Sequence, residues 1–349
     1  MKDDTGVTVA VGSLDSGSTA RWDAYVQSCP EATFFHRAGW KTVIEAAFGH
    51  DCHFLYAERA GAICGVLPLV HIKSFLFGNS LISTGFTVGG GPAASDPEAR
   101  AALDEKAVGI ADELDVDYLE YRSAVPRHSG WATNEGLYVG FRRAIGPDPE
   151  ADMLAIPRKQ RAMVRKGIKA GLQSEVDDDV GRLHEIYAES VRNLGTPVFA
   201  RRYFQALRDT FAGDLDIVTV IHGGTAVASV MNFYFRDQVL PYYGGGTSAA
   251  RDLAANDFMY WEVMRRAVER GFRVYDFGRS KRGTGAYSFK KNWGFEPEPL
   301  VYEYRLRRRD AVPELNPLNP KYRLFIAAWK RLPLPVSKLI GPRIVRNLG

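Results

Sequence analysis

The sequence predicts an α+β protein made of two tandem copies of one unit, each a mixed, mainly antiparallel sheet with helices. The same order of elements recurs in both halves: a meander of strands, three consecutive glycines, a helix and a returning strand. The glycine triplets at residues 89–91 and 244–246 stand at nearly equal separations from the strands that return after them. The alternative is a chance coincidence of two glycine-rich turns. A meander with one crossover helix combines antiparallel strand pairs with a single parallel pair.

The length and composition agree with this organisation. A chain of 349 residues favours two domains of ordinary size. Hydrophobic residues make up 46% and charged residues 25%, which is typical of soluble globular proteins. Because Pro147 and Pro149 lie between the copies, we expect a first domain at residues 1–146, a second at 147–312 and a basic tail at 313–349.

Hydrophobic patterns predict the elements of the first copy. Trp40, Val43, Ile44 and Ala47 recur at helical spacing, and Asp96 before Pro97 is typical of a helix start. The expected helices are 18–28, 38–47 and 98–114, and the expected strands are 53–58, 62–72, 79–84, 118–122 and 137–143.

The second copy repeats this order after two additional helices. The expected helices are 157–170, 180–194 and 256–270, and the expected strands are 216–221, 225–235, 239–243 and 273–277. Gly271 is a typical helix end, and we expect the glycines at 244–246 to break the strand before them.

Composition also bears on the compartment. Residues 1–20 contain no apolar stretch of the kind found in secretory signals, and no run of 18 apolar residues predicts a membrane-spanning helix. Cys29, Cys52 and Cys64 form a sparse, odd set, which fits a reducing cytoplasm. We therefore expect a cytoplasmic protein.

The C-terminal end is strongly basic. The net charge of the chain is +4, but residues 305–349 contain 11 Lys or Arg against two Asp or Glu, a net of +9. One interpretation is peripheral binding to an anionic membrane at its inner face. The other is a helix at 322–329 that packs back on the first domain, with the role of the residues after Pro333 left open.

The two glycine triplets have two interpretations. Bare backbone N–H groups at the end of a strand can approach an anion or a carbonyl oxygen, or the glycines can simply serve a turn with positive φ. For residues 89–91 the two interpretations are equally favoured. In the second copy Tyr242, Tyr243, Arg251 and Asn256 surround the triplet, which favours function.

The meander, glycines and helix resemble the fold of the GNAT N-acetyltransferases. That family binds the pyrophosphate of acetyl-CoA with a loop of the form R/Q-x-x-G-x-G/A. The matching positions here are Arg251, Ala254 and Asn256, so the arginine is present and both glycines are absent. The fold therefore resembles GNAT, while the CoA signature is poor.

Four further segments resemble the FemABX peptidyltransferases. They are Leu240-Pro241-Tyr242-Tyr243-Gly244-Gly245, Asn256-x-x-Met259-Tyr260-Trp261, Tyr275-Asp276-Phe277-Gly278 and Phe289-Lys290-x-x-x-Gly294-Phe295. Residues 192–199 and 275–280 also resemble a FemAB-like subgroup associated with exosortase and exopolysaccharide loci. The resemblance implies two GNAT-like domains, no bound cofactor, a monomer, and transfer of amino acids from aminoacyl-tRNA to a peptidoglycan precursor.

Lys290 is the first catalytic candidate. Acyl transfer passes through a tetrahedral oxyanion, and a fixed ammonium beside it lowers the barrier. The resemblance implies that Phe289 and Lys290 belong to the active site, with Phe289 on the substrate. The alternative is a solvated surface lysine, and Lys291 is the neighbouring competitor for the assignment.

Tyr243 and Asp276 are the other catalytic candidates. A phenol at the end of the strand can orient the acceptor or relay a proton, and the alternative is a buried structural tyrosine. Asp276 alternates with apolar neighbours, so it suits a base or an amine anchor. A structural role, pairing with Arg279 or capping the loop, is slightly favoured.

Substrate-binding candidates are mostly cationic or aromatic. Arg279 and Lys281 suit a phosphate or carboxylate on the acceptor, although a charged loop is usually only solvated. The full set of candidates is Tyr242, Arg251, Asn256, Arg279, Lys281 and Phe289, together with Arg201 and Tyr203, which follow an expected loop. Arg158, Arg161, Arg165 and Lys169 form a cationic stripe that suits a nucleotide diphosphate or a tRNA backbone, or is a solvated helix face.

Hydrolase and metal chemistry lack support in the sequence. No Ser, His and Asp arrangement stands in the context of a nucleophile elbow. Residues 50–53 contain two histidines and a cysteine, but no second ligand pair with zinc spacing accompanies them, so we expect no metal.

Three functions remain in order of preference. The first is an acyl or aminoacyl transferase that forms an amide on a cell-envelope, cell-wall or exopolysaccharide precursor, with aminoacyl-tRNA or acyl-CoA as the activated donor. The second is an acyl-CoA-dependent GNAT N-acyltransferase acting on a small amine or sugar. The third is a non-catalytic module that binds nucleotide-sugars or a membrane surface.

Overall fold

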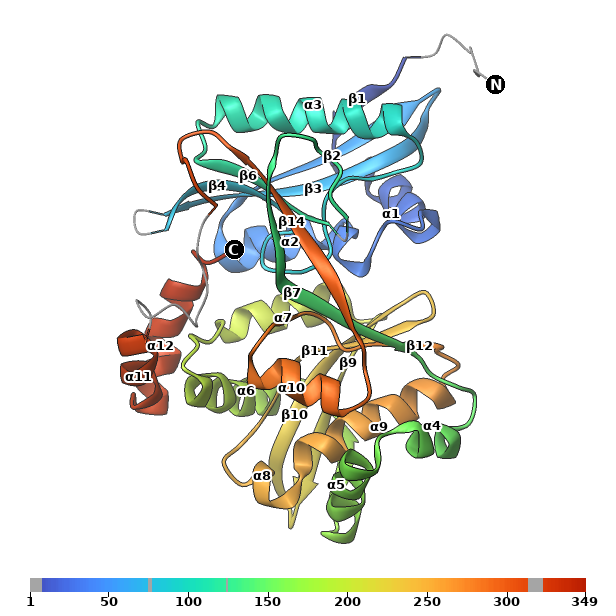
Figure 1. The fold of residues 1–349 in the computed structure, drawn as a ribbon, viewed down its shortest axis with the longest axis vertical. Coiled ribbons are helices and arrows are strands. Elements are labelled where there is room, and N and C mark those ends of the chain that lie inside the picture. The colour runs from blue at the N-terminus through green and yellow to red at the C-terminus, as the bar shows by residue number, and fades with distance from the viewer. Residues whose placement is uncertain (1–7, 75–76, 124, 313–322) are drawn as a thin grey trace. The chain divides into compact units, whose positions relative to one another are not determined.

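The computed structural model describes residues 8–74, 77–123, 125–312 and 323–349. The chain divides into two compact units (Figure 1). Unit 1 contains residues 1–135, 300–313 and 347–349, and unit 2 contains 136–299 and 314–346. These bounds differ from the expected break at 146/147, because the division falls within a strand and residues 300–313 return to unit 1.

Unit 1 is a sheet with helices. Its strands are β1 (Ala10–Ser13), β2 (Asp51–Arg59), β3 (Ala62–Ser74), β4 (Gly78–Ser83), β6 (Tyr118–Ser123) and most of β14 (Pro297–Leu306), paired in that order, with the short β5 (Ala93–Ala94) beside β3. Its helices are α1 (Thr19–Ser28), the 3-10 turn Phe34–His36, α2 (Gly39–Phe48) and α3 (Pro97–Glu113). Asp96 begins α3 because its side chain accepts from the Ala99 N–H at 2.9 Å. The pairs are antiparallel except β4–β6, which α3 connects as the crossover helix.

Unit 2 repeats this arrangement with more helices. Its strands are most of β7 (Ala132–Ala144), then β12 (Val274–Asp276), β11 (Gln238–Gly246), β10 (Thr225–Phe235), β9 (Leu215–His222) and β8 (Gln173–Val176), paired in that order, with β13 (Ser280–Lys281) beside β7. Its helices are α4 (Pro149–Ala155), α5 (Arg158–Lys169), α6 (Gly181–Leu194), α7 (Arg201–Thr210), α8 (Ala250–Leu253), α9 (Ala255–Glu269), α10 (Gly285–Asn292), α11 (Arg323–Lys330) and α12 (Leu334–Val345). The β11–β12 pair is parallel and joined through α9. The predicted α+β architecture of two similar units is therefore confirmed.

The two copies exchange their last strands. β7 follows β6 along the chain, yet its residues 142–144 pair with β12 of unit 2. Conversely, β14 follows the last helix of the second copy, and its residues 301–306 pair with β6 of unit 1. Each sheet is thus completed by a strand from the other half of the chain, a feature that the sequence pattern did not predict.

Helices cover both faces of the sheet in unit 2. A Cβ on Gly245 would meet Ser190 of α6, whereas a Cβ on Gly246 would meet Asn256 of α9. Because successive residues of a strand point to opposite faces, α6 and α9 lie on opposite faces of the sheet. The core between α9 and the sheet includes Phe258, Met264, Tyr275 and Trp293, all of them buried.

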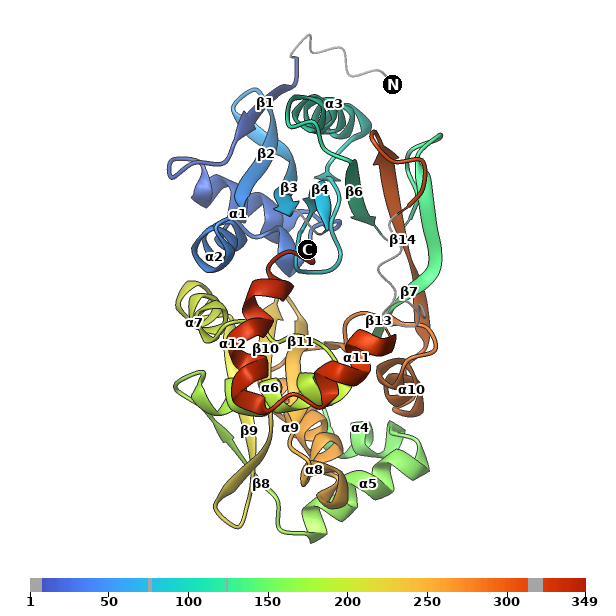
Figure 2. The ribbon, with the colours of Figure 1, turned by 90° about the vertical axis from the view of Figure 1, so that its left-hand side faces the viewer.

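The C-terminal helices pack on unit 2. In Figure 2, α11 and α12 lie beside α6. Arg192 donates to the carbonyl of Leu332 at 3.1 Å, and Lys338 pairs with Glu185 of α6. The sequence predicted that this tail returns to the first domain, but in the described residues α11 and α12 contact α6, and only residues 347–349 cluster with unit 1. Tyr322 lies outside the described residues.

Candidate functional site

The candidate site lies in unit 2, where two parallel strands separate. β11 pairs with β12 only at Gln238 and Val239, opposite Val274 and Tyr275. β12 ends at Asp276, and Gly278 with φ +69° turns the chain away. β11 continues to Gly246 while keeping its pairing with β10 on the other edge. Residues 240–246 therefore have an edge outside the β11–β12 ladder, which is suited to an extended ligand.

The glycines at 244–246 allow helices to approach the strand. We expected them to break it, but β11 runs through all three and none has a positive φ. An ideal Cβ would lie 2.5 Å from Ser190 at Gly245 and 2.7 Å from Asn256 at Gly246. At Gly244 it would lie 3.1 Å from the hydroxyl of Tyr260. The triplet is therefore required for close packing rather than for a turn.

Lys290 lies on α10, which the sequence treated as the end of a loop. The Thr284 side chain caps this helix by accepting from the Tyr287 N–H at 3.3 Å. The Lys290 ammonium donates to the carbonyls of Arg279 at 3.0 Å and Gly278 at 3.3 Å. Burial lowers the pKa of Lys290 to about 7, because the effect of Asp276 only partly offsets it. The amine and ammonium forms are therefore both populated near neutral pH.

Asp276 holds the turn after β12. Its carboxylate accepts from the Gly278 N–H at 2.8 Å, which is the loop-capping geometry considered above. Burial raises the pKa of Asp276 despite the nearby charges of Arg142 and Lys290. The carboxylate therefore lies close enough to influence Lys290 electrostatically.

Arg279 and Lys281 both lie near the ring of Tyr138. The Arg279 guanidinium lies 4.6 Å from the centroid of Tyr138, and the Lys281 ammonium lies 5.3 Å from it. Burial, followed by the charge of Arg279, lowers the pKa of Lys281 to about 8. Lys281 belongs to β13 and pairs with Tyr138 of β7, so it is fixed on a strand, whereas Arg279 lies in the connection between β12 and β13.

Aromatic rings line the approach to Lys290. Phe289 packs with Tyr260 at 5.6 Å, with Trp293 at 6.1 Å and with Phe277 at 6.2 Å between ring centroids. Burial raises the pKa of Tyr260 to about 12, so its hydroxyl stays protonated and can donate. Tyr260 was named above only as part of a motif. Its position on the helix that follows the glycine triplet could have marked it as a candidate.

Asp257 joins three helices behind the site. Its Oδ1 atom accepts from Gln160 Nε2 of α5 and from the Trp293 indole, each at 2.9 Å. Trp293 directly follows α10, so the carboxylate ties α10 to α9. The sequence analysis missed this residue, because its partners lie far from it along the chain.

Tyr243 and Tyr203 meet, but not at Lys290. Their hydroxyls lie 2.7 Å apart and both residues are buried. Their rings also pack with Tyr187, Phe199 and Phe204 beside α6 and α7. Burial raises the pKa of both phenols well above the ordinary value. Tyr203 was expected after a loop and lies in α7, and Tyr242 packs its ring against Tyr243 at 4.8 Å.

Side chains fill the segment that corresponds to the CoA-binding loop of the GNAT family. The one-turn helix α8 carries Arg251, which is exposed, and Ala254 follows it with φ +56°. Asn256 points its Oδ1 atom toward Gly246, and this buried atom has no hydrogen-bond partner in the structure. A side chain thus occupies the space that a glycine would leave for a pyrophosphate at the start of α9.

The predicted cationic stripe on α5 is present. α5 packs through Gln160, Val164 and Gly167 and carries six Lys or Arg without an acidic residue. The hollow beside it has a volume of about 440 Å³ and is lined by Arg158, Arg161, Ala162, Arg165, Lys166 and Lys169. In the described part of the chain none of these cations forms an ion pair with a carboxylate, although Arg161 donates to the Leu154 carbonyl. Arg201, by contrast, is exposed on α7 and lies 3.9 Å from Asp179.

The glycines at 89–91 form hydrogen bonds with other residues of unit 1. Gly90 N–H donates to the Arg122 carbonyl at 2.6 Å, and the carbonyls of Gly89 and Gly91 contact the side chains of Thr33 and His36. Gly89 and Gly91 have positive φ. The structure therefore favours the turn interpretation in this copy.

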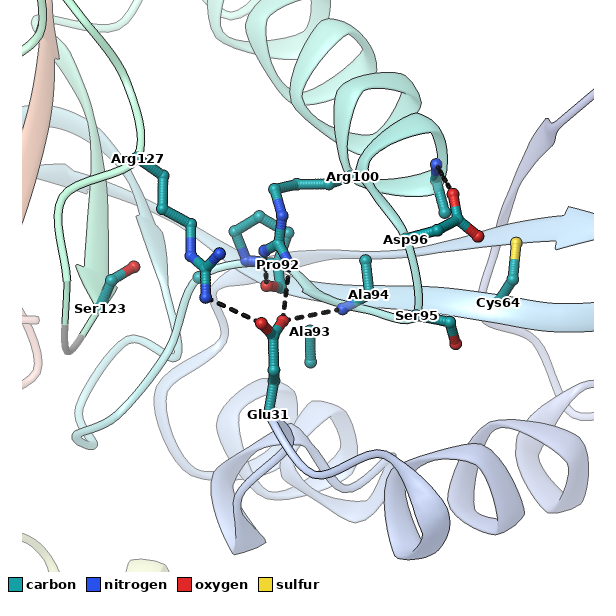
Figure 3. A network of polar contacts seen from close by, with 12 residues as sticks. Glu31, Cys64, Pro92, Ala93, Ala94, Ser95, Asp96, Arg100, Ser123 and Arg127 are labelled. Atoms are coloured by element: carbon teal, nitrogen blue, oxygen red, sulfur yellow. Dashed lines mark hydrogen bonds and ion pairs between the residues drawn. The ribbon is translucent and has the colours of Figure 1, made fainter. Parts of the chain in front are cut away.

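A carboxylate holds the chain that follows this triplet (Figure 3). Glu31 accepts from Arg100 at 2.7 Å and from Arg127 at 2.8 Å, and Arg100 also donates to the Pro92 carbonyl. Burial would raise the pKa of Glu31, but the Arg100 contact outweighs it and the pKa is lowered.

No group of three or more His, Cys, Asp or Glu that suits a metal lies within the described residues.

Comparisons with known proteins identify the domain type. The family model described as acetyltransferase (GNAT) domain matches residues 158–291. A search of the curated proteins found no significant match. The structure titled "Crystal structure of FemX" is similar with a TM-score of 0.68 and 16% identity over 91% of this chain and 100% of that one.

Two further structures share the fold. The C-terminal domain of a putative lysylphosphatidylglycerol synthetase from Agrobacterium fabrum has a TM-score of 0.56 and 14% identity, covering 83% of this chain and 92% of that one. A tandem GNAT protein from the clavulanic acid biosynthesis pathway has a TM-score of 0.54 and 14% identity, covering 87% of this chain and 100% of that one. The predicted FemX-like fold of two GNAT-like units is confirmed, and residues 158–291 match the acetyltransferase (GNAT) domain. Within the described residues, no helix is long and apolar enough to cross a membrane.

Proposed function

We propose that this GNAT-superfamily acyltransferase forms an amide on an amine of a cell-envelope or exopolysaccharide precursor, with charged tRNA as the acyl donor. The observation that carries the proposal is the position of Lys290. Its side chain is half-buried beside the turn that follows β12, and its ammonium lies 5.7 Å from the ring centroid of Phe277 and 5.8 Å from that of Phe141. The FemX-like fold supports the class of acceptor.

The reaction balances without a redox step. The lone pair of the acceptor amine attacks the carbonyl carbon of the activated ester, and the carbonyl π electrons move to oxygen. Lys290 in its ammonium form faces the oxyanion and stabilises it. Collapse restores the carbonyl and expels the ribose oxygen of the tRNA, which takes the proton that the amine loses. In this proposal Tyr260, whose hydroxyl lies beside Gly244, donates to the carbonyl oxygen, and residues 240–246 hold the extended chain.

Two observations favour charged tRNA over acyl-CoA. Asn256 occupies the space at the start of α9 where a pyrophosphate would need a glycine. The basic face of α5 lacks carboxylate partners in the described structure, which suits a run of phosphates. Acyl-CoA remains the second candidate donor, because Arg251 is retained and residues 158–291 match an acetyltransferase model.

Equilibrium binding tests the donor directly. The purified full chain is titrated with bulk tRNA, acetyl-CoA and a long-chain acyl-CoA at two salt concentrations. We expect salt-sensitive binding of tRNA and weak binding of both CoA esters. Lys166→Glu with Lys169→Glu should weaken tRNA binding, while Lys41→Glu, at a half-buried position on α2 of unit 1, should not. Tight binding of acyl-CoA without binding of tRNA would transfer the proposal to the second donor.

A further inference from the structure

The helices α11 and α12 each have one face against unit 2. Ile326 of α11 packs on Gly195 at the end of α6, and Trp329 is buried. In α12 the buried residues are Ser337, Gly341 and Val345, which recur every fourth residue and share one face. This packing fixes the orientation of both helices on α6.

Their opposite faces are apolar and exposed. Leu324 is 84% exposed, and Ala327, Ala328 and Arg331 share its face at helical spacing. In α12, Val336, Leu339 and Arg343 lie opposite the buried face, and Leu339 is 66% exposed. Three more large apolar side chains are exposed nearby: Phe325 on α11, Val336 on α12 and Leu194 at the end of α6. Several large apolar side chains on one small element are unusual for a solvated surface.

The charges on α11, α12 and the residues after them have one sign, and Lys338 pairs with Glu185 of α6. Residues 323–349 contain six Lys or Arg and no Asp or Glu. Lys330 and Arg331 are exposed at the end of α11, and Arg343 shares the outer face of α12. Each helix thus carries an exposed apolar strip and, of its own charges, only cations, which is complementary to a surface that presents anionic headgroups above hydrocarbon.

We propose that the outer faces of α11 and α12 bind the surface of an anionic lipid bilayer. Leu324 and Leu339 enter the headgroup boundary, and Lys330, Arg331 and Arg343 contact lipid phosphates. The interaction is peripheral, and it stands independently of the proposed transfer reaction.

Vesicle flotation with the purified full chain tests this proposal. One set of vesicles contains phosphatidylcholine alone, and the other contains equal parts of phosphatidylcholine and phosphatidylglycerol. We expect binding to the second set only, weakened by salt. Leu324→Glu with Leu339→Glu should weaken binding roughly tenfold or more, because two apolar contacts are lost. Lys330→Glu with Arg331→Glu should weaken it to a similar extent.

Matched variants separate this surface from other exposed groups. Leu154→Glu on α4 removes a leucine that is 63% exposed elsewhere in unit 2 and should leave binding unchanged. Lys166→Glu with Lys169→Glu is the charge control on α5, and its failure to alter vesicle binding is expected. Equal binding to both vesicle types, or loss of binding only in the α5 variant, would overturn the proposal. A dimer in light scattering that Leu324→Glu with Leu339→Glu dissociates, without vesicle binding by either protein, would instead assign the surface to a second copy.

Discussion

The ammonium nitrogen of Lys290 lies 3.0 Å from the carbonyl oxygen of Arg279 and donates a hydrogen bond to it. This contact joins α10 to the turn that leaves β12, so the side chain has a defined position before any substrate arrives. Because the same burial lowers the pKa of Lys290 to about 7, position and protonation are coupled at this residue.

Replacing Lys290 should slow acyl transfer. Lys290→Ala removes the cation proposed to stabilise the oxyanion, and we expect a loss of roughly 10²-fold or more in kcat. The measurement is steady-state transfer with the donor that binds in the titration above. The adjacent exposed Lys291→Ala is the control and should retain activity. Equal turnover in wild type and Lys290→Ala would remove Lys290 from the mechanism.

Lys290 should also cost stability near neutral pH. Its pKa falls from 10.5 to about 7 on folding, so between these values the unfolded chain binds more protons and the free energy of unfolding rises with pH. The pKa of Lys281 is lowered to about 8, so this residue also makes the free energy of unfolding rise with pH. We expect Lys290→Met to stabilise the protein at pH 7 by on the order of 1–3 kcal/mol and to reduce this slope. Urea unfolding across the pH range measures both; a destabilised variant would contradict the expectation.

His128 of unit 1 should show the opposite pH dependence. Burial lowers its pKa, but hydrogen bonds to Asp104 and Glu303, each at 3.1 Å, outweigh this and raise it to about 9. The stability that the imidazolium contributes is therefore complete below 6.5 and lost as the pH rises through 9. We expect the His128 imidazolium to contribute about 1–2 kcal/mol to the free energy of unfolding after solvent screening.

The titration can be followed at the residue itself. The imidazole resonance of His128 should titrate with a midpoint near 9, and His128→Gln should remove the corresponding loss of unfolding free energy at high pH. A midpoint near the ordinary value would show that the two carboxylates do not hold the imidazolium.

Asp257 should stabilise the fold through its hydrogen bonds with Gln160 and Trp293. Asp257→Ala leaves Gln160 and the Trp293 indole without their acceptor, and we expect a loss of roughly 2–4 kcal/mol in unfolding free energy. Because Trp293 follows α10, activity should fall as well, through displacement of Lys290. Asp252→Ala on exposed α8 is the matched control and should be neutral. Unchanged urea unfolding of Asp257→Ala would show that this carboxylate does not hold α10.

Much of the fold could be predicted because it depends on local patterns. The long strands 62–72 and 225–235 and the helices after each glycine triplet were found close to their observed bounds. β14 was missed, although Glu303 and Arg305 alternate with apolar residues as in a strand, and its partner β6 lies far away along the chain. Hydrophobic periodicity identifies strands but not the sheet edge that each one joins.

The candidate site could be predicted only in part for the same reason. Lys290 was identified from its motif, but its burial depends on Phe141 and Phe277, which come from other elements. Tyr243 was proposed as a catalytic phenol, yet its hydroxyl contacts Tyr203, forty residues away. Contacts across such separations leave no spacing in the sequence, so the catalytic roles of Tyr243 and Asp276 stay predictions.

The exchange of final strands has a consequence for how the protein is made. The sheet of unit 1 cannot be completed until β14, which ends at Leu306, has been synthesised, because β14 is the neighbour of β6. On the ribosome, the N-terminal half therefore waits with an open sheet edge while most of the second half emerges. Expressing residues 1–146 alone would preserve that unfinished state. Each half of the chain therefore depends on a strand from the other half to complete its sheet during biosynthesis.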